Sequence, residues 1–398
     1  MCMKKILFML ASCAVIIAGI IIFNTVTDAK KEQAIPENTT DSLPLDGAKY
    51  ILAFSEANAS RENKGAFFTI DQQGNYLSRS AEMNISDPIA FKQADKDAYL
   101  VNNSSSDRYT VDLTTGKIQS LKATQQKNAQ SFTLHTNGEY VIYDVAADYT
   151  KPQQLVYWKR ANAHVKKIVT IPNGFAQSIY IHHDIAYIST SNPDATQYIH
   201  QVNLKTGKLM QAKKLTLKAE EYTQSALPSN QSMIMFHGKL YVAVTKTHVI
   251  PATKDYQSDV YEFNGSLLQL NPKTLKIEKK IAIKDKNFNP DTLAVVQNKL
   301  VILDTFEKAC VMNKTTKITP MKFKIDEQMK NELAQMDTNS DQITVINQTA
   351  YIFTQYVKNE KTRGEINAYN LKTGQHLSRT IIPYPAKDYY IMTFAVID

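Results

Sequence analysis

Short runs of alternating apolar and polar residues recur from residue 49 to the end of the chain. Between residues 178 and 216, polar turns separate the runs SIYIHH, IAYISTS, YIHQVNL and LMQAKKLT. A period of two is typical of half-buried β-strands, and four such runs predict an antiparallel meander. Comparable units occupy residues 87–122, 131–171, 231–283, 291–323 and 341–383.

The last hairpin of each unit has a characteristic turn, such as Leu204-Lys205-Thr206-Gly207. Related turns lie at or near Gly74, Gly116, Ala163, Leu275, Thr316 and Gly374. They recur about every 40–50 residues, with longer intervals from 207 to 275 and from 316 to 374. Four strands at this period are the signature of a β-propeller.

The units add up to an all-β, seven-bladed propeller of four-stranded antiparallel blades. Residues 49–80 supply only three strands, and the missing innermost strand is available in the apolar run YYIMTFAVID at 389–398. We expect this run to pair beside residues 49–56 and close the ring. An open ring would leave two sheet edges exposed to pairing with other chains.

The runs AYISTSN at 186–192 and LYVAVT at 240–245, with their Leu-Lys-Thr-Gly type of turn, resemble the YVTN-type repeat of bacterial extracytoplasmic β-propellers. The resemblance covers nearly all of residues 49–398 and implies a fold, because members of that family have varied roles. A WD40 protein is less well supported, since no Gly-His and Trp-Asp pair recurs. Quinoprotein propellers use a repeated Trp motif, which a chain with only Trp158 does not supply.

The N-terminus carries Lys4 and Lys5, followed by an uncharged apolar run from Ile6 to Phe23. Eighteen residues at about 1.5 Å each cover about 27 Å, just enough to cross a hydrocarbon core. Residues 1–23 are therefore predicted to be a membrane anchor, with the span at 6–23. A secretory signal peptide, cleaved near Ala29, is the second interpretation.

A lipoprotein is the third interpretation, because Leu10-Ala11-Ser12-Cys13 resembles a bacterial lipobox in which Cys13 would be lipidated. The apolar run before Cys13 is short for a signal sequence, which argues against it. All three interpretations place the body outside the cytoplasm. Residues 24–47 are polar with two prolines and predict a flexible spacer before a propeller at 48–398.

The amino-acid composition excludes several classes of function for this protein. The 398 residues include 43% hydrophobic ones, which suits a large globular body, and we expect that body to be monomeric. The formal charge of +8 is dispersed over many lysines, so nucleic-acid binding is not expected. Of three cysteines only Cys310 lies in the body, which excludes an internal disulfide and a cysteine-based zinc site.

Three long connections, residues 217–230, 246–264 and 324–340, interrupt the repeat. In a propeller, connections between blades and those between second and third strands open on the same face, so these loops should surround one mouth of the channel. The last connection predicts a helix that Asp326 caps. Its apolar residues at 325, 329, 333 and 336 fall on one face. Such loops carry function or are tolerated insertions.

Aromatic residues on or beside the connections are the predicted binding residues, because their rings can stack on sugars or other flat apolar surfaces. They are Tyr149, Phe175, Tyr222, Tyr256, Phe288 and Tyr389. The competing expectation is that each ring packs beneath its own loop.

The triplet His182-His183-Asp184 is the most metal-like motif. Its two imidazoles should diverge on a strand, and the triplet should lie at the turn between first and second strands, opposite the long loops. A metal site is therefore not predicted there, and no cofactor is predicted. The sequence contains no nucleophile elbow, phosphate loop or zinc-binding helix motif.

The sequence thus predicts a tethered or secreted module that binds an envelope glycan, peptide or protein without catalysing a reaction. The first alternative is a propeller hydrolase or lactonase with a metal at the channel mouth. The second is an accessory subunit that docks a partner through residues 325–336.

Overall fold

The computed structural model describes most of the chain from residue 35 onward. The described residues are 35, 37–38, 41–56, 64–85, 88–102, 108–121, 133–145, 152–162, 166–172, 174–192, 194–217, 220–223, 231–251, 260–304, 308–324, 338–356, 362–385 and 389–397. The N-terminal apolar segment with Cys13, and the predicted helix at 325–336, lie outside them. Among the described residues, none forms a helix long and apolar enough to span a membrane.

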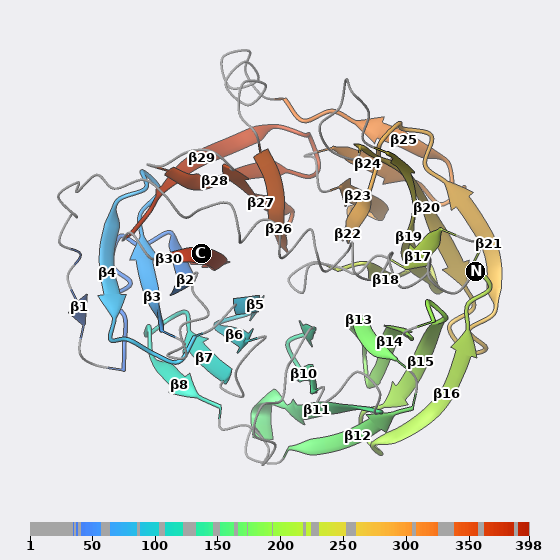
Figure 1. Ribbon diagram of the computed structural model, residues 1–398, viewed down its shortest axis with the longest axis horizontal. Coiled ribbons are helices and arrows are strands. Elements are labelled where there is room, and N and C mark those ends of the chain that lie inside the picture. Colours follow the sequence, from blue (N-terminus) through green and yellow to red (C-terminus); the bar gives the residue numbers. More distant parts are fainter. Residues whose placement is uncertain are drawn as a thin grey trace.

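The described strands form seven antiparallel sheets arranged around a ring (Figure 1), as the repeat predicts. Blade 1 comprises β30 (Tyr389–Val396), β2 (Tyr50–Glu56), β3 (Gly65–Ile70) and β4 (Tyr76–Ser80), with the short β1 (Glu37–Asn38) added in parallel outside β4. Blade 2 comprises β5 (Pro88–Ala94), β6 (Asp97–Asn102), β7 (Arg108–Asp112) and β8 (Ile118–Ser120). Blade 3 comprises β9 (Leu134–Thr136), β10 (Tyr140–Val145), β11 (Gln153–Lys159) and β12 (Lys167–Ile171), and a 3-10 turn, η1 (Arg160–Asn162), follows β11.

The other four blades follow in chain order. Blade 4 comprises β13 (Phe175–His182), β14 (Ile185–Ser191), β15 (Gln197–Asn203) and β16 (Lys208–Lys214). Blade 5 comprises β17 (Glu221–Thr223), β18 (Met233–Phe236), β19 (Lys239–Ile250), β20 (Val260–Leu270) and β21 (Ile277–Ala282). Blade 6 comprises β22 (Pro290–Val296), β23 (Lys299–Asp304), β24 (Ala309–Met312) and β25 (Ile318–Met321). Blade 7 comprises β26 (Thr338–Ile346), β27 (Thr349–Tyr356), β28 (Thr362–Asn370) and β29 (His376–Pro383).

The hydrophobic core is divided into layers between neighbouring blades. Phe68 of blade 1 and Phe353 of blade 7 share one buried cluster, and Phe67 of blade 1 shares another with Leu100 of blade 2. Both faces of a blade are thus buried, which explains why second strands such as YVIYDV in β10 are almost continuously apolar. Each blade depends on its two neighbours for burial.

The two ends of the propeller meet in blade 1, which confirms the predicted closure. β30 is the innermost strand of that blade and pairs antiparallel with β2, from Tyr50 opposite Val396 to Glu56 opposite Tyr389. Gln342 of blade 7 fixes the strand from the side, because its Oε1 accepts hydrogen bonds from Phe394 N at 3.0 Å and Thr393 Oγ1 at 2.7 Å. The ring therefore has no free inner edge at its seam.

The recurring turn is a blade's outermost hairpin, between its third and fourth strands. It contains a residue in the left-handed region, and that residue is Gly116 at φ +72° in blade 2 but Leu275 at φ +54° in blade 5. An Asp or Asn at its start stabilises the turn; Asp112 Oδ1, for example, accepts a hydrogen bond from Thr114 N at 2.8 Å. This side-chain bond explains how the repeat tolerates non-glycine residues.

The second half of the predicted spacer is not free chain. Glu37 and Asn38 pair with Arg79 and Ser80 of β4, and Leu43 is buried in the layer between blades 1 and 2. Leu43 N donates to Gly116 O at 2.9 Å. The expectation of a flexible spacer up to residue 47 is therefore wrong for this part, because Leu43 and the partly buried Leu45 bury apolar surface against the propeller. We call residues 37–47 the strap.

Substitution of Gly116 is expected to release the strap. A Cβ atom added there would lie 1.9 Å from Leu43 O, and the positive φ adds backbone strain of about 1–2 kcal/mol. We expect Gly116→Ala to lower the unfolding free energy by about 2–3 kcal/mol. We also expect the strap to become sensitive to limited proteolysis.

Gly238→Ala is the matched control, because its φ is +70° while nothing lies within 4 Å of the added Cβ. Gly238→Ala therefore has the backbone strain of Gly116→Ala without its steric clash. Equal destabilisation and equal proteolysis of the two variants would show that strap packing at Gly116 contributes nothing.

Candidate functional site

The innermost strands of the blades surround the centre of the ring (Figure 1). Lys92 of β5, His135 of β9 and Tyr180 of β13 follow one another across blades 2, 3 and 4. Lys92 and His135 interact electrostatically, and the His135 and Tyr180 rings are 5.7 Å apart, edge to face. The innermost strands of three neighbouring blades thus contribute one polar arc, Lys92, His135 and Tyr180, which we call the channel arc.

Lys92 is partly exposed, yet neighbouring protein groups restrict its contact with water. Burial lowers the pKa of its ammonium group to about 7, and the nearby carboxylate of Asp291 opposes that shift. Asp291 belongs to β22 of blade 6, so the interaction joins two non-adjacent blades. A lysine with a pKa near neutrality and a defined charged partner is typical of a functional site.

His135 is enclosed more completely than Lys92, with only 4% of its surface exposed. Burial lowers the pKa of its imidazole to about 3, and the charge of Lys92 contributes to the same shift. The ring is therefore neutral at physiological pH. It makes no hydrogen bond to any residue that the structure describes.

Asp291 owes its position to an irregularity in β22. The pairing with β23 skips one residue between Pro290 and Thr292, and Asp291 is that residue. Such bulges turn a side chain away from the regular alternation and are common beside functional sites. Asp291 is fully buried at the inner edge of blade 6.

A second feature is a two-stranded ribbon that blade 5 adds at the connection between its second and third strands. β19 has 12 residues and β20 has 11, whereas the matching strands β14 and β15 of blade 4 have 7 each. The four or five extra residues extend the hairpin by about 15 Å. Beyond Thr247, which donates its backbone N–H to Glu220 O at 3.3 Å, β19 pairs among the described residues only with β20, up to Ile250 opposite Val260.

One face of this ribbon is apolar and aromatic. Thr247 lies opposite Phe263 and Val249 lies opposite Tyr261, and paired residues two apart share a face. Tyr222 of β17 joins this face, since its hydroxyl hydrogen-bonds Thr247 Oγ1 at 2.6 Å. The Tyr261 ring is 37% exposed.

The predicted aromatic residues differ in how far the structure buries them. Phe288 is fully buried between blades 5 and 6, and Phe175 at the start of β13 is also buried, so neither presents a ring to a ligand. Phe288 packs in the buried cluster that blades 5 and 6 share, which agrees with the competing expectation of internal packing. Tyr222 is half-buried on the ribbon face. Tyr149 and Tyr256 lie outside the described residues, and for Tyr389 the structure describes only a backbone that begins β30.

The three predicted insertions are partly regular structure. Most of the described part of 246–264 extends the β19–β20 hairpin rather than forming a loop. Residues 221–223 of the 217–230 connection form β17, which continues the inner edge of blade 5 beyond β18. Residues 338–340 already belong to β26, so the prediction of helical structure through residue 340 is wrong there. These residues pair with β27, which outweighs local propensity.

His182-His183-Asp184 lies at the turn between β13 and β14, as predicted, but its imidazoles do not diverge. His183 adopts φ +52° at the turn, and the two ring centroids are 4.2 Å apart. Asp184 is engaged elsewhere, with Lys205 Nζ at 2.7 Å and the Tyr140 hydroxyl at 2.8 Å. Among the described residues, no group of three or more His, Cys, Asp or Glu side chains is placed to hold a metal ion.

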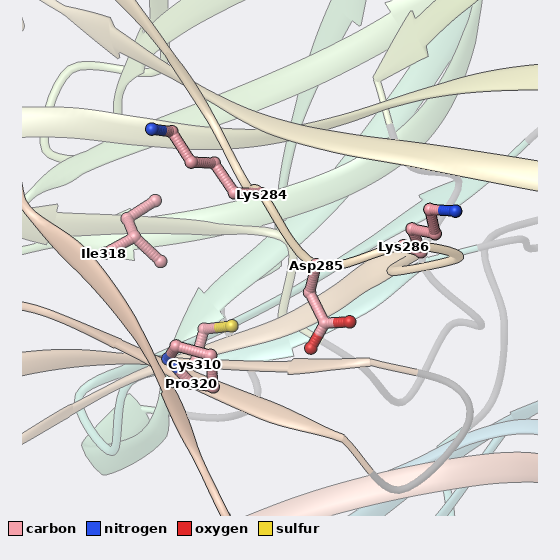
Figure 2. A pocket seen from close by; sticks show the side chains of 6 residues that line it. All are labelled: Lys284, Asp285, Lys286, Cys310, Ile318 and Pro320. Carbon is pink, nitrogen blue, oxygen red and sulfur yellow. The ribbon is translucent and has the colours of Figure 1, made fainter.

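A pocket of about 350 Å³ lies beside blade 6, between the β21–β22 connection and the outer strands (Figure 2). Asp285 points toward Cys310, while the ammonium groups of Lys284 and Lys286 point away from it. Burial, with the charges of Asp285 and Asp304, raises the pKa of the Cys310 thiol to about 12. A thiol that stays protonated is a poor nucleophile, so this pocket has no catalytic cysteine.

Glu365 of β28 is the centre of a polar network in blade 7. Its fully buried carboxylate accepts hydrogen bonds from Arg379 Nε at 2.8 Å, Asn367 Nδ2 at 2.6 Å and the Tyr356 hydroxyl. Burial and the neighbouring carboxylate raise the pKa of Tyr356. The carboxylate has a donor at each oxygen, which is what a buried structural charge requires.

Comparison with known proteins identifies no family for this chain. No model of a protein family matches this chain, and no curated protein matches it. The chain is similar to dihydro-heme d1 dehydrogenase NirN in complex with DHE, with 7% identity over 91% of this chain and 77% of that chain and a TM-score of 0.45. It is also similar to apo AztD from Citrobacter koseri, with 11% identity over 88% of this chain and 98% of that chain and a TM-score of 0.44. The β-propeller domain of the Trilobed protease from Pyrococcus furiosus gives 9% identity over 72% and 82%, with a TM-score of 0.42.

The residues of the channel arc were not selected from the sequence. His135 is one of several scattered histidines there, and Lys92 and Asp291 are two of many charged residues. Their meeting depends on the position of seven blades around a ring and on a bulge in β22. A single sequence indicates neither the arrangement of the blades around the ring nor the bulge in β22.

Proposed function

We propose that this protein is an extracytoplasmic binding module, held at the membrane by its N-terminal apolar segment. Its partner is a protein or peptide of the cell envelope with an apolar segment that covers the ribbon of blade 5. A propeller supplies a rigid support, and the ribbon extends from it at the connection between β19 and β20. No observation on the described residues favours the metal-dependent hydrolase over this function.

The observation that carries this proposal is the apolar face of the ribbon, on which Tyr261 is exposed and Val249 and Phe263 are half-buried. A two-stranded ribbon is only marginally stable in water unless another surface covers it. Val249, Tyr261 and Phe263 lie on one face, and the half-buried Tyr222 extends it toward the ring. Aromatic anchors of this kind dominate the energetics of protein interfaces.

The proposal is tested by cross-linking in cells of the source organism. A photoreactive phenylalanine analogue at position 261 of the full chain is expected to form a discrete adduct that a protease removes. The analogue at position 377 is the matched control, since Leu377 of β29 is also exposed, at 49%, but on blade 7. Tyr261→Ser with Val249→Ser should weaken binding to the captured partner at least tenfold.

Two results would contradict the proposal. Equal adducts at positions 261 and 377 would show that contact with the ribbon is not selective. An adduct that resists protease but is removed by glycan-degrading enzymes would identify a glycan as the partner.

A further inference from the structure

The outermost hairpin turns and fourth strands of blades 4, 5 and 6 concentrate the positive charge of the protein. We call them the basic rim, which comprises residues 205–214, 273–282 and 314–322. The rim contains eleven lysines and one acidic residue, Glu278, and therefore has a formal charge of +10, whereas the whole chain has +8. The matching segments of blades 7, 1 and 2 contain four lysine and arginine residues in all. These segments are residues 372–383, 73–80 and 114–120. The fold thus gathers on one side of the ring lysines that are dispersed along the sequence.

The three segments of the basic rim form one outer surface. β16, β21 and β25 are the outermost strands of their blades and follow one another around the ring (Figure 1). Gln211 Nε2 of β16 donates a hydrogen bond to Lys273 O in the turn of blade 5 at 2.8 Å. Lys279 Nζ of β21 donates to Thr316 Oγ1 in the turn of blade 6 at 2.6 Å. Each outer strand is thus joined to the hairpin turn of the next blade, and all eleven rim lysines are exposed.

Most of the charge on the rim is not neutralised by the described protein. Two rim lysines, Lys205 and Lys280, form ion pairs with acidic residues. The other nine form no ion pair with any carboxylate that the structure describes. The carboxylate of Glu278 is 2.7 Å from the ammonium group of Lys239, which lies outside the rim. A cluster of like charges of this kind creates a positive potential that attracts anions.

We propose that the basic rim binds a flexible linear polymer with a negatively charged phosphate on each of its units. Successive phosphates pair with lysines of β16, β21 and β25, so one polymer chain follows the outside of the ring across three blades. Binding releases the counterions that are condensed on the polymer, which favours the complex at low salt. The rim is separate from the ribbon of blade 5, and this binding does not depend on the function proposed for the ribbon.

The shape of the rim favours a flexible chain over a flat bilayer. Seven blades complete the circle, so the outer surface turns by about 50° from one blade to the next. The outer strands of blades 4 and 6 therefore face directions about 100° apart. A flat membrane would contact one or two of these strands at a time, whereas a flexible polymer bends around all three.

The side chains of the rim favour a simple phosphate polymer over a nucleic acid. Proteins that bind single-stranded nucleic acids stack aromatic rings on the bases. The rim contains no aromatic residue and no arginine. A lysine ammonium group acts as a point charge, so it pairs with a phosphate from many directions. The rim therefore supplies charge without groups that recognise bases.

The first test measures the binding of fluorescently labelled inorganic polyphosphate to the full chain in micelles of a non-ionic detergent. The logarithm of the affinity should fall linearly with the logarithm of the salt concentration. Removal of two rim lysines from any one blade should weaken binding about tenfold at low salt and reduce the magnitude of that slope by about 1. The three variants are Lys213→Gln with Lys214→Gln, Lys273→Gln with Lys276→Gln, and Lys314→Gln with Lys317→Gln.

The matched control is Lys117→Gln with Lys372→Gln. It removes the same charge from the exposed outer turns of blades 2 and 7, which lie outside the rim, and should bind polyphosphate as the unaltered chain does. Tyr261→Ser with Val249→Ser should also leave polyphosphate binding unchanged, which separates the rim from the ribbon.

A second measurement requires no substitution. An amine-reactive reagent labels exposed lysines, and mass spectrometry reports how far a ligand protects each of them. Polyphosphate should protect the rim lysines of all three blades but not Lys117 or Lys372. The full chain in vesicles of phosphatidylglycerol should show no more protection of the rim than the full chain in vesicles of phosphatidylcholine.

Three outcomes would overturn the proposal. The first is no binding of polyphosphate, or an equal loss of binding in the control and in the rim variants. The second is protection of the rim by phosphatidylglycerol vesicles as strong as that by polyphosphate, which would identify an anionic bilayer as the partner. The third is binding of an oligothymidylate with the same number of phosphates at least tenfold more tightly than polyphosphate, which would identify a nucleic-acid site.

Discussion

Removal of residues 386–398 is expected to abolish the folded state. These residues include β30, whose Met392, Phe394 and Val396 are buried in the layer between blades 7 and 1. Loss of a buried phenylalanine alone costs about 3–5 kcal/mol, and whole domains are stable by only about 5–15 kcal/mol. The truncated chain would also expose the entire inner edge of β2, which invites aggregation. We therefore expect an insoluble product or loss of the cooperative thermal transition.

Restoration of the strand in trans separates ring closure from a general effect of truncation. A synthetic peptide of residues 386–398, added during refolding, should pair with β2 and restore a cooperative transition. The same peptide with Phe394→Ala and Val396→Ala keeps the backbone hydrogen bonds but loses the buried side chains, and should restore little. A truncated chain that unfolds at the temperature of the intact chain would contradict the closure by β30.

Most of the fold could be predicted from the sequence because each blade repeats the same local physics. Alternation with period two marks the strands, and the turn at Gly207 and its relatives marks the outer hairpins. The closure by β30 was predictable because blade 1 was one strand short and an apolar run remained at the C-terminus. These features involve neighbouring strands only, so a sequence displays them directly.

The strap and the ribbon are two features whose structure could not be predicted from the sequence. The strap contains Leu43 and Leu45 among polar residues, and only the three-dimensional packing reveals that Leu43 fits between blades 1 and 2. The insertion at 246–264 was placed on the correct blade, but its apolar residues were interpreted as a loop although they extend β19 and β20. Whether an insertion forms a loop or a longer hairpin depends on strand pairing, which the composition does not determine.

The channel site was not predictable, for a geometric reason. Lys92, His135 and Asp291 are separated by up to about two hundred positions in the sequence, and each lies on a different blade. Their proximity requires the curvature of the complete ring, which brings blades 2 and 6 to face each other across the channel. Asp291 also depends on a bulge, which moves one side chain off the regular alternation.

His135 is expected to make the protein sensitive to acid. An exposed histidine has a pKa of about 6.5, whereas burial and the charge of Lys92 lower the pKa of His135 to about 3. Between these values the unfolded chain binds a proton that the folded chain does not, so the unfolding free energy falls as the pH falls. The loss from this group should reach about 2–3 kcal/mol at pH 4.5 and about 4–5 kcal/mol below pH 3.

The contribution of His135 is isolated by comparison of unfolding free energies from urea titrations at pH 7.5 and pH 4.5. Carboxylates that titrate in the same range affect all variants alike, so the difference between variants reports the histidine. We expect His135→Gln to lose about 2–3 kcal/mol less than the unaltered chain over this interval. His237→Asn, in the exposed turn between β18 and β19, should lose as much as the unaltered chain. Identical pH dependence of His135→Gln and the unaltered chain would show that the imidazole accepts a proton freely in the folded state, and the described enclosure of His135 between Lys92 and Tyr180 would then be wrong.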